Sequence, residues 1–562
     1  MRLFEILMMA ANAIIIIKLV IAGHSRTNKL AEVSPEAENP WVRNPEVINP
    51  GMNNFWVRGS WAGCLQPAKQ GTRSPAEGTV LPVLSMVFAI ISMLSEGFRL
   101  FMVPAYLLTV FLLHGIARAI TKKTAAYETA VTADTSVSNT SVRSKRHVSR
   151  KPGIFGTVIL ILIFAISVAL AYLFPVIDLP EPAGPYPVGT KLAAFTDASR
   201  KEPHTVSGEH RKIPVQIWYP ASDTAEKKRV NWLINKKMSR IFAECKKVPD
   251  IFGQLNLVKT NSYLDAGLSA DKGKYPVILF SGGGAMFNGQ NVIQMEELAS
   301  HGYIVCAVGH AYDDFACTFP DGSVIPYDPE HLKALGNETG KAIDRAESEL
   351  KAGDNDPEFG RFILRGCSLN NSDAITWSRD MSFAADELAR LNGGDNNGME
   401  DNTDNMFLGR LDMANLGVFG HSFGGAAAGE TCLRDERFKA FINMDGSPFG
   451  TAVDNVIRQP FMILTVGKNV KRIISSGYCV DQKNFMTVYI EGSEHMNFSD
   501  FNIILPNIGS LSGILGSIGS DRQREIMNYY ILAFFNKYLK GTTEQLIDSA
   551  ASKYPEVMVE KR

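Results

Sequence analysis

The chain has 562 residues and a formal net charge of −1 at pH 7, with 57 lysine and arginine residues against 58 aspartate and glutamate residues. Its length leaves room for a large enzyme domain and an accessory region. The charge balance gives no electrostatic argument for a nucleic-acid partner. Its 7 cysteines include no Cys-x-x-Cys pair, so neither a metal site nor a cofactor is expected.

Long apolar stretches occur only in the first 180 residues or so. Residues 1–23 are apolar but carry Glu5 and Lys18, and we interpret them as a transmembrane helix, with a signal peptide or an amphipathic surface segment as alternatives. Residues 79–117 hold two apolar runs around a short polar turn, which predicts a transmembrane hairpin. Residues 154–177 are uncharged and long enough to cross a bilayer core of about 30 Å.

The loops between these segments, residues 24–78 and 118–153, are rich in lysine and arginine. Residues 118–153 also have the composition of a flexible tether. Because cytoplasmic loops carry the excess of positive charge, we predict a multi-pass membrane protein with the rest of the chain on the exocytoplasmic side. The alternative is that Arg2 holds the N-terminus in the cytoplasm, which would reverse this topology. Membrane lipids are expected to contact the N-terminal helices.

Residues 179–562 are expected to form a second, catalytic domain, entered through a stretch rich in proline and glycine. Short apolar runs there alternate with helix-like segments, including 374–391 and 521–539. Buried strands between helices predict an α/β fold with a mostly parallel, doubly wound sheet. The predicted strands are 215–219, 276–280, 303–308, 416–419, 440–444, 461–466 and 485–490.

A glycine-framed serine follows the strand 416–419. The run Gly420-His421-Ser422-Phe423-Gly424-Gly425 leads into a helix-prone segment of small residues. A strand, a G-x-S-x-G turn and a helix form the nucleophile elbow of α/β-hydrolases, in which the sharp turn needs glycine on either side of the serine. Ser422 is therefore the predicted nucleophile.

A serine nucleophile needs a histidine as base, and in α/β-hydrolases the chain order is serine, acid, histidine. His495 is the only histidine after Ser422, and it follows the predicted strand 485–490. The alternative for a histidine in such a loop is a solvated side chain without a role. The required chain order nevertheless selects His495. His310, which follows the strand 303–308, is expected to be a structural or pocket-lining residue.

The acid that orients this histidine could follow either of the two strands after the elbow. Asp445 comes directly after 440–444, whereas the later loop, 467–472, is basic and holds no carboxylate. We therefore choose Asp445. Its alternative role is that of a turn-forming aspartate before Gly446.

The oxyanion of an acyl-transfer intermediate needs two backbone N–H donors. Phe423, the residue after the nucleophile, is the first expected donor. The second is expected from the turn Ser281-Gly282-Gly283-Gly284-Ala285, with Gly284 as the choice and Gly283 as the alternative. This turn could also be a flexible glycine loop or a phosphate loop, but no Gly-Lys-Ser/Thr follows it.

Several segments from Gly184 to the C-terminal helix carry a family resemblance: 275–281, 298–305, 420–425 and 492–501. They are similar to the platelet-activating-factor acetylhydrolase family of serine lipases. In that family the acid also follows the strand after the nucleophile, so the resemblance implies a triad of Ser422, Asp445 and His495. One departure is that the family's Ser-His-Gly-Leu-Gly turn is Ser281-Gly282-Gly283-Gly284-Ala285 here, which puts the pocket shape in doubt.

The resemblance implies a carboxylic ester hydrolase that acts through an acyl-enzyme. Its expected substrates are short-chain or oxidised acyl esters, such as phospholipids like platelet-activating factor. Because one triad serves many acyl groups, a broad esterase, a polyesterase or a peptidase is the alternative. The non-enzymatic alternative is a catalytically inactive membrane scaffold.

Overall fold

The computed structural model describes residues 154–248, 252–350, 357–395, 405–467, 477–542 and 553–562, with short helical pieces between residues 8 and 115. The chain divides into two compact units, one of residues 2–170 and the other of residues 171–562 together with Met1. Helix α4 (Ile154–Leu173) contains the boundary between them.

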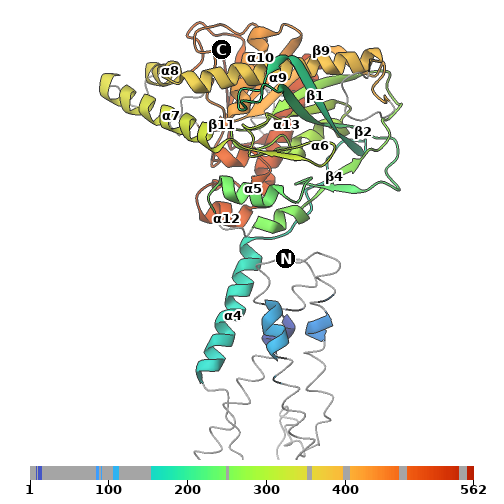
Figure 1. Cartoon of the computed structure of the whole chain (residues 1–562), viewed down its shortest axis with the longest axis vertical. Coiled ribbons are helices and arrows are strands. Elements are labelled where there is room, and N and C mark those ends of the chain that lie inside the picture. The colour runs from blue at the N-terminus through green and yellow to red at the C-terminus, as the bar shows by residue number, and fades with distance from the viewer. Residues whose placement is uncertain are drawn as a thin grey trace, which may run out of the picture. The chain divides into compact units, whose positions relative to one another are not determined.

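The first unit consists, where it is described, of helical pieces that pack on one another (Figure 1). Asn12 Nδ2 donates to Thr109 Oγ1 at 3.0 Å, and Ser85 Oγ donates to Asn12 Oδ1 at 2.7 Å. Leu108 and Leu112 are buried beside apolar side chains of α4. The predicted loops 24–78 and 118–153, and most of 1–23 and 79–117, lie outside the described residues.

Within the part of the chain that the structure describes, no helix combines the length and the apolarity needed to cross a membrane. This finding contradicts the predicted multi-pass localisation with an exocytoplasmic catalytic domain, and it leaves the predicted span at 154–177 without support. Most of the predicted spans in 1–23 and 79–117 lies outside the described residues. The finding also removes the support for lipid contacts through these helices. The physical reason is that an apolar run in a sequence records only a tendency to leave water and does not show what surface covers it.

The second unit is built on an eleven-stranded sheet in the order β13-β12-β11-β10-β9-β5-β6-β2-β1-β4-β3. Its central strands run parallel to one another: β6 (Ile304–Val308), β5 (Tyr275–Ser281), β9 (Leu411–His421), β10 (Phe438–Met444), β11 (Phe461–Val466) and β12 (Phe485–Ile490). Antiparallel pairs occur toward both edges, which consist of β2 (His210–Pro220), β1 (Val188–Lys201), β4 (Lys259–Leu264), β3 (Arg229–Asn231) and β13 (Val557–Lys561). The sheet is therefore mixed, with the predicted parallel arrangement in its centre.

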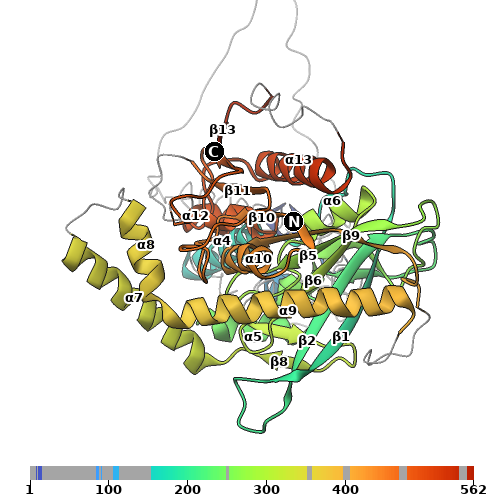
Figure 2. The same ribbon diagram turned by 90° about the horizontal axis from the view of Figure 1, so that it is seen from above.

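Helices cover both faces of this sheet (Figures 1 and 2). Helices α6 (Val292–Ser300) and α13 (Ser520–Leu539) pack together, and α9 (Ser368–Gly393) packs with α10 (Phe423–Arg434). The remaining elements lie in the connections: α5 (Met238–Cys245), η3 (Phe252–Leu257), β7 (Ala316–Thr318), β8 (Val324–Pro326), α7 (Pro329–Leu350), α8 (Pro357–Gly366), η4 (His495–Phe498), α11 (Phe501–Ile504) and α12 (Pro506–Leu511).

The burial of the central strands of the second unit explains why they could be predicted from the sequence. Every residue of β5, β6 and β11 is buried, as expected for parallel strands covered on both faces. Each predicted strand coincides with a strand of the sheet, and the predicted helices 374–391 and 521–539 lie within α9 and α13. Those predictions are confirmed.

Candidate active site

Ser422 lies in the turn between β9 and α10 with φ 55° and ψ −122°, a backbone conformation that L-residues rarely adopt. The glycines around it have no room for a side chain. A Cβ on Gly420 would lie 2.1 Å from the carbonyl oxygen of Gly424, and a Cβ on Gly424 would lie 2.1 Å from that of Ser281. The local sequence therefore allows the tight turn that a nucleophile elbow requires.

The structure brings Ser422, His495 and Asp445 together at the carboxyl ends of β9, β12 and β10. His495 Nε2 lies 3.0 Å from Ser422 Oγ, and His495 Nδ1 lies 2.6 Å from Asp445 Oδ2. Thr465 Oγ1 donates to the other oxygen of Asp445 at 2.7 Å. The Asp445 side chain is fully buried, whereas that of His495 is 35% exposed. A buried carboxylate, an accessible imidazole and a serine hydroxyl thus form one hydrogen-bonded chain.

Two further side chains hold the loop of His495, and the sequence arguments missed both. Gln290 Nε2 lies within hydrogen-bond distance of His421 Nδ1, and His421 Nε2 lies 3.1 Å from the carbonyl oxygen of His495. If Gln290 donates, His421 carries its proton on Nε2 and donates it to that carbonyl. Burial, with the nearby charge of His495, lowers the pKa of His421 well below its usual value. His421 is therefore a neutral bridge, and its place inside the G-x-S-x-G run was the only available signal.

Gln290 also accepts a hydrogen bond from one amide of the glycine turn. Its Oε1 accepts the N–H of Gly283 at 2.7 Å, and the N–H of Ala285 donates to the carbonyl oxygen of Asp313 at 3.2 Å. Among the described residues, the N–H of Gly284 has no such acceptor. A Cβ on Gly284 would lie 3.6 Å from Phe423 Cβ, so the turn is close to the start of α10, where amides lack intrahelical acceptors.

A cavity of about 510 Å³ borders Gly284 and Phe423. The Trp377 ring packs edge-on against the Phe423 ring, with 4.8 Å between centroids. The wall of the cavity includes acidic and histidine side chains and apolar side chains of α7. They are Asp313, Asp328, His331 and Asp373, and Leu332, Leu335 and Ile343. Although burial opposes it, Asp313 and Asp328 raise the pKa of the neighbouring His204 to about 9, which indicates a strongly negative wall.

A second serine, histidine and aspartate meet in the core behind this cavity. His310 Nε2 lies 3.0 Å from Ser281 Oγ, and His310 Nδ1 lies 2.9 Å from Asp380 Oδ2. Burial alone would raise the pKa of Asp380, but the charge of Arg211, whose Nη2 lies 2.7 Å from Asp380 Oδ2, holds it well below its usual range. His310 is fully buried and stacks on Trp377 at 3.9 Å, which agrees with its prediction as a structural residue.

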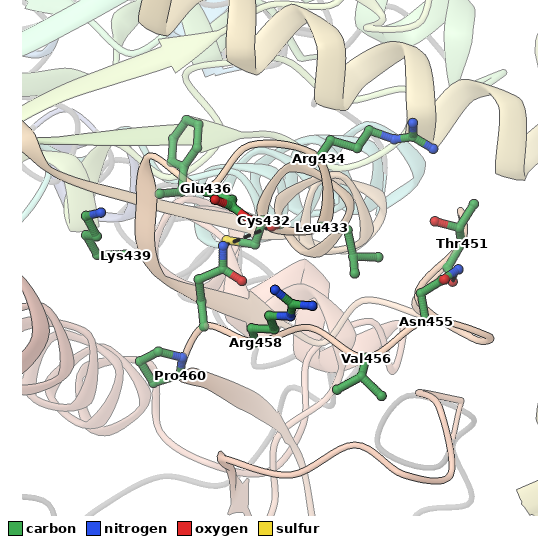
Figure 3. A pocket seen from close by; sticks show the side chains of 12 residues that line it. Cys432, Leu433, Arg434, Glu436, Lys439, Thr451, Asn455, Val456, Arg458 and Pro460 are labelled. Atoms are coloured by element: carbon green, nitrogen blue, oxygen red, sulfur yellow. Dashed lines mark hydrogen bonds between the residues drawn. The ribbon is translucent and has the colours of Figure 1, made fainter.

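A larger hollow of about 640 Å³ lies elsewhere on the second unit. Figure 3 shows its lining side chains, which come from the end of α10, the start of β10 with the turn before it, and the segment before β11. Among them are Arg434, Glu436, Thr451 and Arg458, but none of the predicted site residues. This hollow therefore contributes nothing to the arrangement around Ser422.

Comparisons with known proteins show which family this chain is similar to. The family model of platelet-activating factor acetylhydrolase, isoform II, matches residues 172–321 and 384–553, which is more than half of the chain. A platelet-activating factor acetylhydrolase of Cavia porcellus is 28% identical over 378 residues, covering 64% of this chain and 78% of that protein. A protein of Arthroderma benhamiae named as a probable 1-alkyl-2-acetylglycerophosphocholine esterase is 23% identical over 431 residues, covering 68% and 93%.

Among solved structures, a ferulic acid esterase from Streptomyces cinnamoneus superimposes with a TM-score of 0.51 at 24% identity, covering 68% of this chain and 99% of that one. That likeness, with the mixed sheet and its flanking helices, shows an α/β-hydrolase-like fold. The resemblance seen in the sequence is thereby confirmed. The chain belongs to the platelet-activating factor acetylhydrolase, isoform II, family, and it is an ester hydrolase.

Proposed function

We propose that Ser422, His495 and Asp445 form the catalytic triad of this ester hydrolase. The observation that carries the proposal is the unbroken hydrogen-bonded chain from Asp445 Oδ2 through His495 to Ser422 Oγ, with separations of 2.6 Å and 3.0 Å. Ser422 also has the positive φ of an elbow nucleophile. Asp445 holds the imidazole in the tautomer that leaves Nε2 free to accept the serine proton.

In the first half of the reaction, Ser422 Oγ attacks the acyl carbon while His495 Nε2 takes its proton. The negative charge that develops on the carbonyl oxygen is stabilised by the amides of Phe423 and Gly284. When the tetrahedral intermediate collapses, the ester bond breaks and His495 gives its proton to the leaving alkoxide. Water then attacks the acyl-enzyme with the same base, and the products are the free acid and the regenerated serine.

The proposed substrates are esters with short or oxidised acyl groups, including phospholipids like platelet-activating factor. The names of the relatives support this class, because one is a platelet-activating factor acetylhydrolase and another is named for a 2-acetyl phospholipid. The cavity beside Gly284 and Phe423 also supports it, since its volume is about 510 Å³ and its lining includes the rings of Trp377 and Phe423.

Replacing the nucleophile tests the triad. Ser422→Ala should remove p-nitrophenyl acetate turnover and labelling by a fluorophosphonate probe while the thermal midpoint stays close to that of the wild type. Ser512→Ala, at an exposed serine outside the site, is the matched control and should keep both signals. Turnover or labelling that persists in Ser422→Ala would contradict the assignment.

A substrate panel tests the acyl preference separately. Acetyl, butyryl and dodecanoyl p-nitrophenyl esters should be compared with phosphatidylcholines that carry a short or a long acyl group at the 2-position, and with peptides. We expect kcat/KM to fall as the acyl chain lengthens. Equal rates for all esters would support a broad esterase, and peptide cleavage would support a peptidase.

A further inference from the structure

Two histidines and an aspartate converge beside the substrate cavity. His204 lies between β1 and β2, Asp313 follows β6, and His331 lies in the first turn of α7. His204 Nε2 is 3.2 Å from Asp313 Oδ1, and His331 Nε2 is 3.9 Å from the same oxygen. One ligand atom from each residue lies within 4.8 Å of those of the other two. Three segments far apart in the chain thus direct metal-ligating atoms toward one point.

These separations agree with the coordination of a small divalent ion. Zinc binds histidine nitrogen and carboxylate oxygen at about 2.0–2.2 Å, so two ligands in a tetrahedral site lie roughly 3.4 Å apart. The separations of 3.2 Å and 3.9 Å bracket that value. Side-chain adjustments that draw together the three ligand atoms, which lie within 4.8 Å of one another, would complete a site.

Asp313 contributes a buried carboxylate to this cluster. Its side chain is only 7% exposed, and its Oδ2 accepts a hydrogen bond from Trp377 Nε1 at 2.9 Å. Its Oδ1 faces both imidazoles, because it pairs with His204 Nε2 at 3.2 Å and lies 3.9 Å from His331 Nε2. A divalent ion would replace the proton of His204 in this ion pair and would supply the positive charge that a buried carboxylate needs.

Carboxylates beside the two histidines would help to orient them as metal ligands. His204 Nδ1 lies 3.2 Å from Asp328 Oδ2, which leaves Nε2 as the ligand atom. Asp328 is itself fixed, because its Oδ1 accepts the N–H groups of Glu330 and His331 at 3.0 Å and 3.1 Å. His331 Nε2 lies 2.7 Å from Asp373 Oδ2, so an ion there would replace the proton of that bond and have Asp373 beside it as a further oxygen donor.

The local charge also favours a cation. Asp313, Asp328 and Asp373 surround the cluster, whereas the nearest arginine, Arg211, lies 3.6 Å from Asp313 Oδ2. Arg211 is itself paired with two other buried carboxylates, Glu202 and Asp380. The charge of Arg211 is therefore shared with Glu202 and Asp380 and does not balance the three aspartates.

We propose that His204, Asp313 and His331 form a binding site for a divalent transition metal ion of the zinc type. Two imidazoles and one carboxylate are donors that suit zinc, cobalt and similar ions. Because His331 and Asp313 both line the cavity, the bound ion ties α7 to the loop after β6 at the wall of that cavity. The site is separate from Ser422 and does not depend on the proposed triad.

Metal titration of the full chain tests this site. After dialysis against EDTA, Zn²⁺ should bind one ion per chain in calorimetry, and Co²⁺ should give the visible absorption of a tetrahedral complex. Saturation at about a hundredfold excess over Kd should raise the thermal midpoint by about 3 °C. Ser422→Ala protein should bind equally well, so failure of the triad and failure of the metal site give different results.

Substitutions distinguish this cluster from adventitious binding. His331→Gln and Asp313→Asn should abolish saturable binding, and Asp328→Asn, which can still cap α7, should weaken it by about 10–100-fold. His301→Gln is the matched control, because His301 also contacts a carboxylate, that of Glu297, but belongs to no such cluster. Absence of saturable binding to the wild type, or equal affinity in His331→Gln and Asp313→Asn, would overturn the proposal.

Discussion

Two arrangements of serine, histidine and aspartate lie side by side in this fold, and they differ in surroundings rather than in geometry. In each, the histidine Nε2 is 3.0 Å from the serine hydroxyl, and Nδ1 is 2.6 Å or 2.9 Å from the carboxylate. Ser281 ends β5 next to Gly420 of β9, so the two serines occupy neighbouring strand ends. Hydrogen-bond geometry alone therefore does not identify a nucleophile.

Access and charge separate the two arrangements. His495 is 35% exposed beside a serine in an elbow, whereas Ser281, His310 and Asp380 are fully buried. Asp445 accepts a hydrogen bond from the neutral Thr465, but Asp380 is paired with the charged Arg211. Burial also lowers the pKa of His310, which keeps its imidazole neutral. The first arrangement suits proton transfer, and the second joins β5, β2 and α9.

The largest expected difference between Asp445 and Asp380 is in the effect of their replacement on kcat. Asp445→Asn should lower kcat for p-nitrophenyl acetate by about 10⁴-fold, because an amide no longer selects the tautomer in which Nε2 accepts the serine proton. The thermal midpoint should change little. Asp454→Asn, at an exposed aspartate that pairs with Arg365, should leave kcat unchanged. A kcat of Asp445→Asn within tenfold of the wild type would show that Asp445 does not orient His495.

Asp380→Ala should instead act on stability. Removing Asp380 leaves Arg211 with one of its two hydrogen-bonded carboxylate partners, Glu202, and also breaks the bond to His310, which should cost about 3–5 kcal/mol. Urea unfolding followed by circular dichroism measures this loss. Asp386→Ala is the control, since Asp386 is 55% exposed in its contact with Arg437 and should contribute less than about 1 kcal/mol. Similar losses in the two variants would contradict the role given to the buried pair.

A third buried carboxylate, that of Glu296, extends the comparison because its direct partners are neutral. Its Oε1 accepts hydrogen bonds from Asn261 N and Ser262 Oγ. Burial raises the pKa of Glu296 to about 7 from its usual 4.5, despite these hydrogen bonds. The folded protein then binds a proton that the unfolded chain has lost, so stability should be fully present below pH 4.5 and should fall as the pH rises to about 7.

The size of this pH effect is about 3 kcal/mol if Glu296 alone is considered, since each pKa unit corresponds to about 1.4 kcal/mol. Glu296→Gln keeps a polar side chain of the same shape and removes the titration. The difference in urea midpoint between the wild type and Glu296→Gln should therefore change between pH 5 and pH 8, to the disadvantage of the wild type at the higher pH. Parallel profiles would refute the raised pKa.

Local patterns explain what could be predicted from the sequence. Ser422, Asp445 and His495 could be chosen because each follows a buried apolar strand, and the strands themselves are continuous apolar runs. Their catalytic roles stay predictions, although the structure brings their atoms within hydrogen-bond distance. Hydropathy led to a wrong localisation because it does not reveal which surface covers an apolar segment.

Contacts between distant segments explain what could not be predicted. The side chain of Gln290 contacts that of His421, and no spacing rule connects two residues that lie 131 positions apart. The same holds for His204, Asp313 and His331, because metal-site motifs recognise only ligands that are close in sequence. The prediction that no metal site exists rested on such motifs, and the cluster lies outside their reach.

The smallest expected effect concerns the buried serine, and it is the most direct comparison with Ser422→Ala. Ser281→Ala removes one buried hydrogen bond to His310, which should cost about 1 kcal/mol of unfolding free energy. Because the Gly284 amide belongs to the same turn, kcat should fall by less than tenfold, while fluorophosphonate labelling of Ser422 continues. Thermal unfolding, kcat and probe labelling measured on the same preparation separate these effects. If Ser281→Ala lost labelling as completely as Ser422→Ala, the two arrangements would form one functional unit and the distinction drawn from their burial would be wrong.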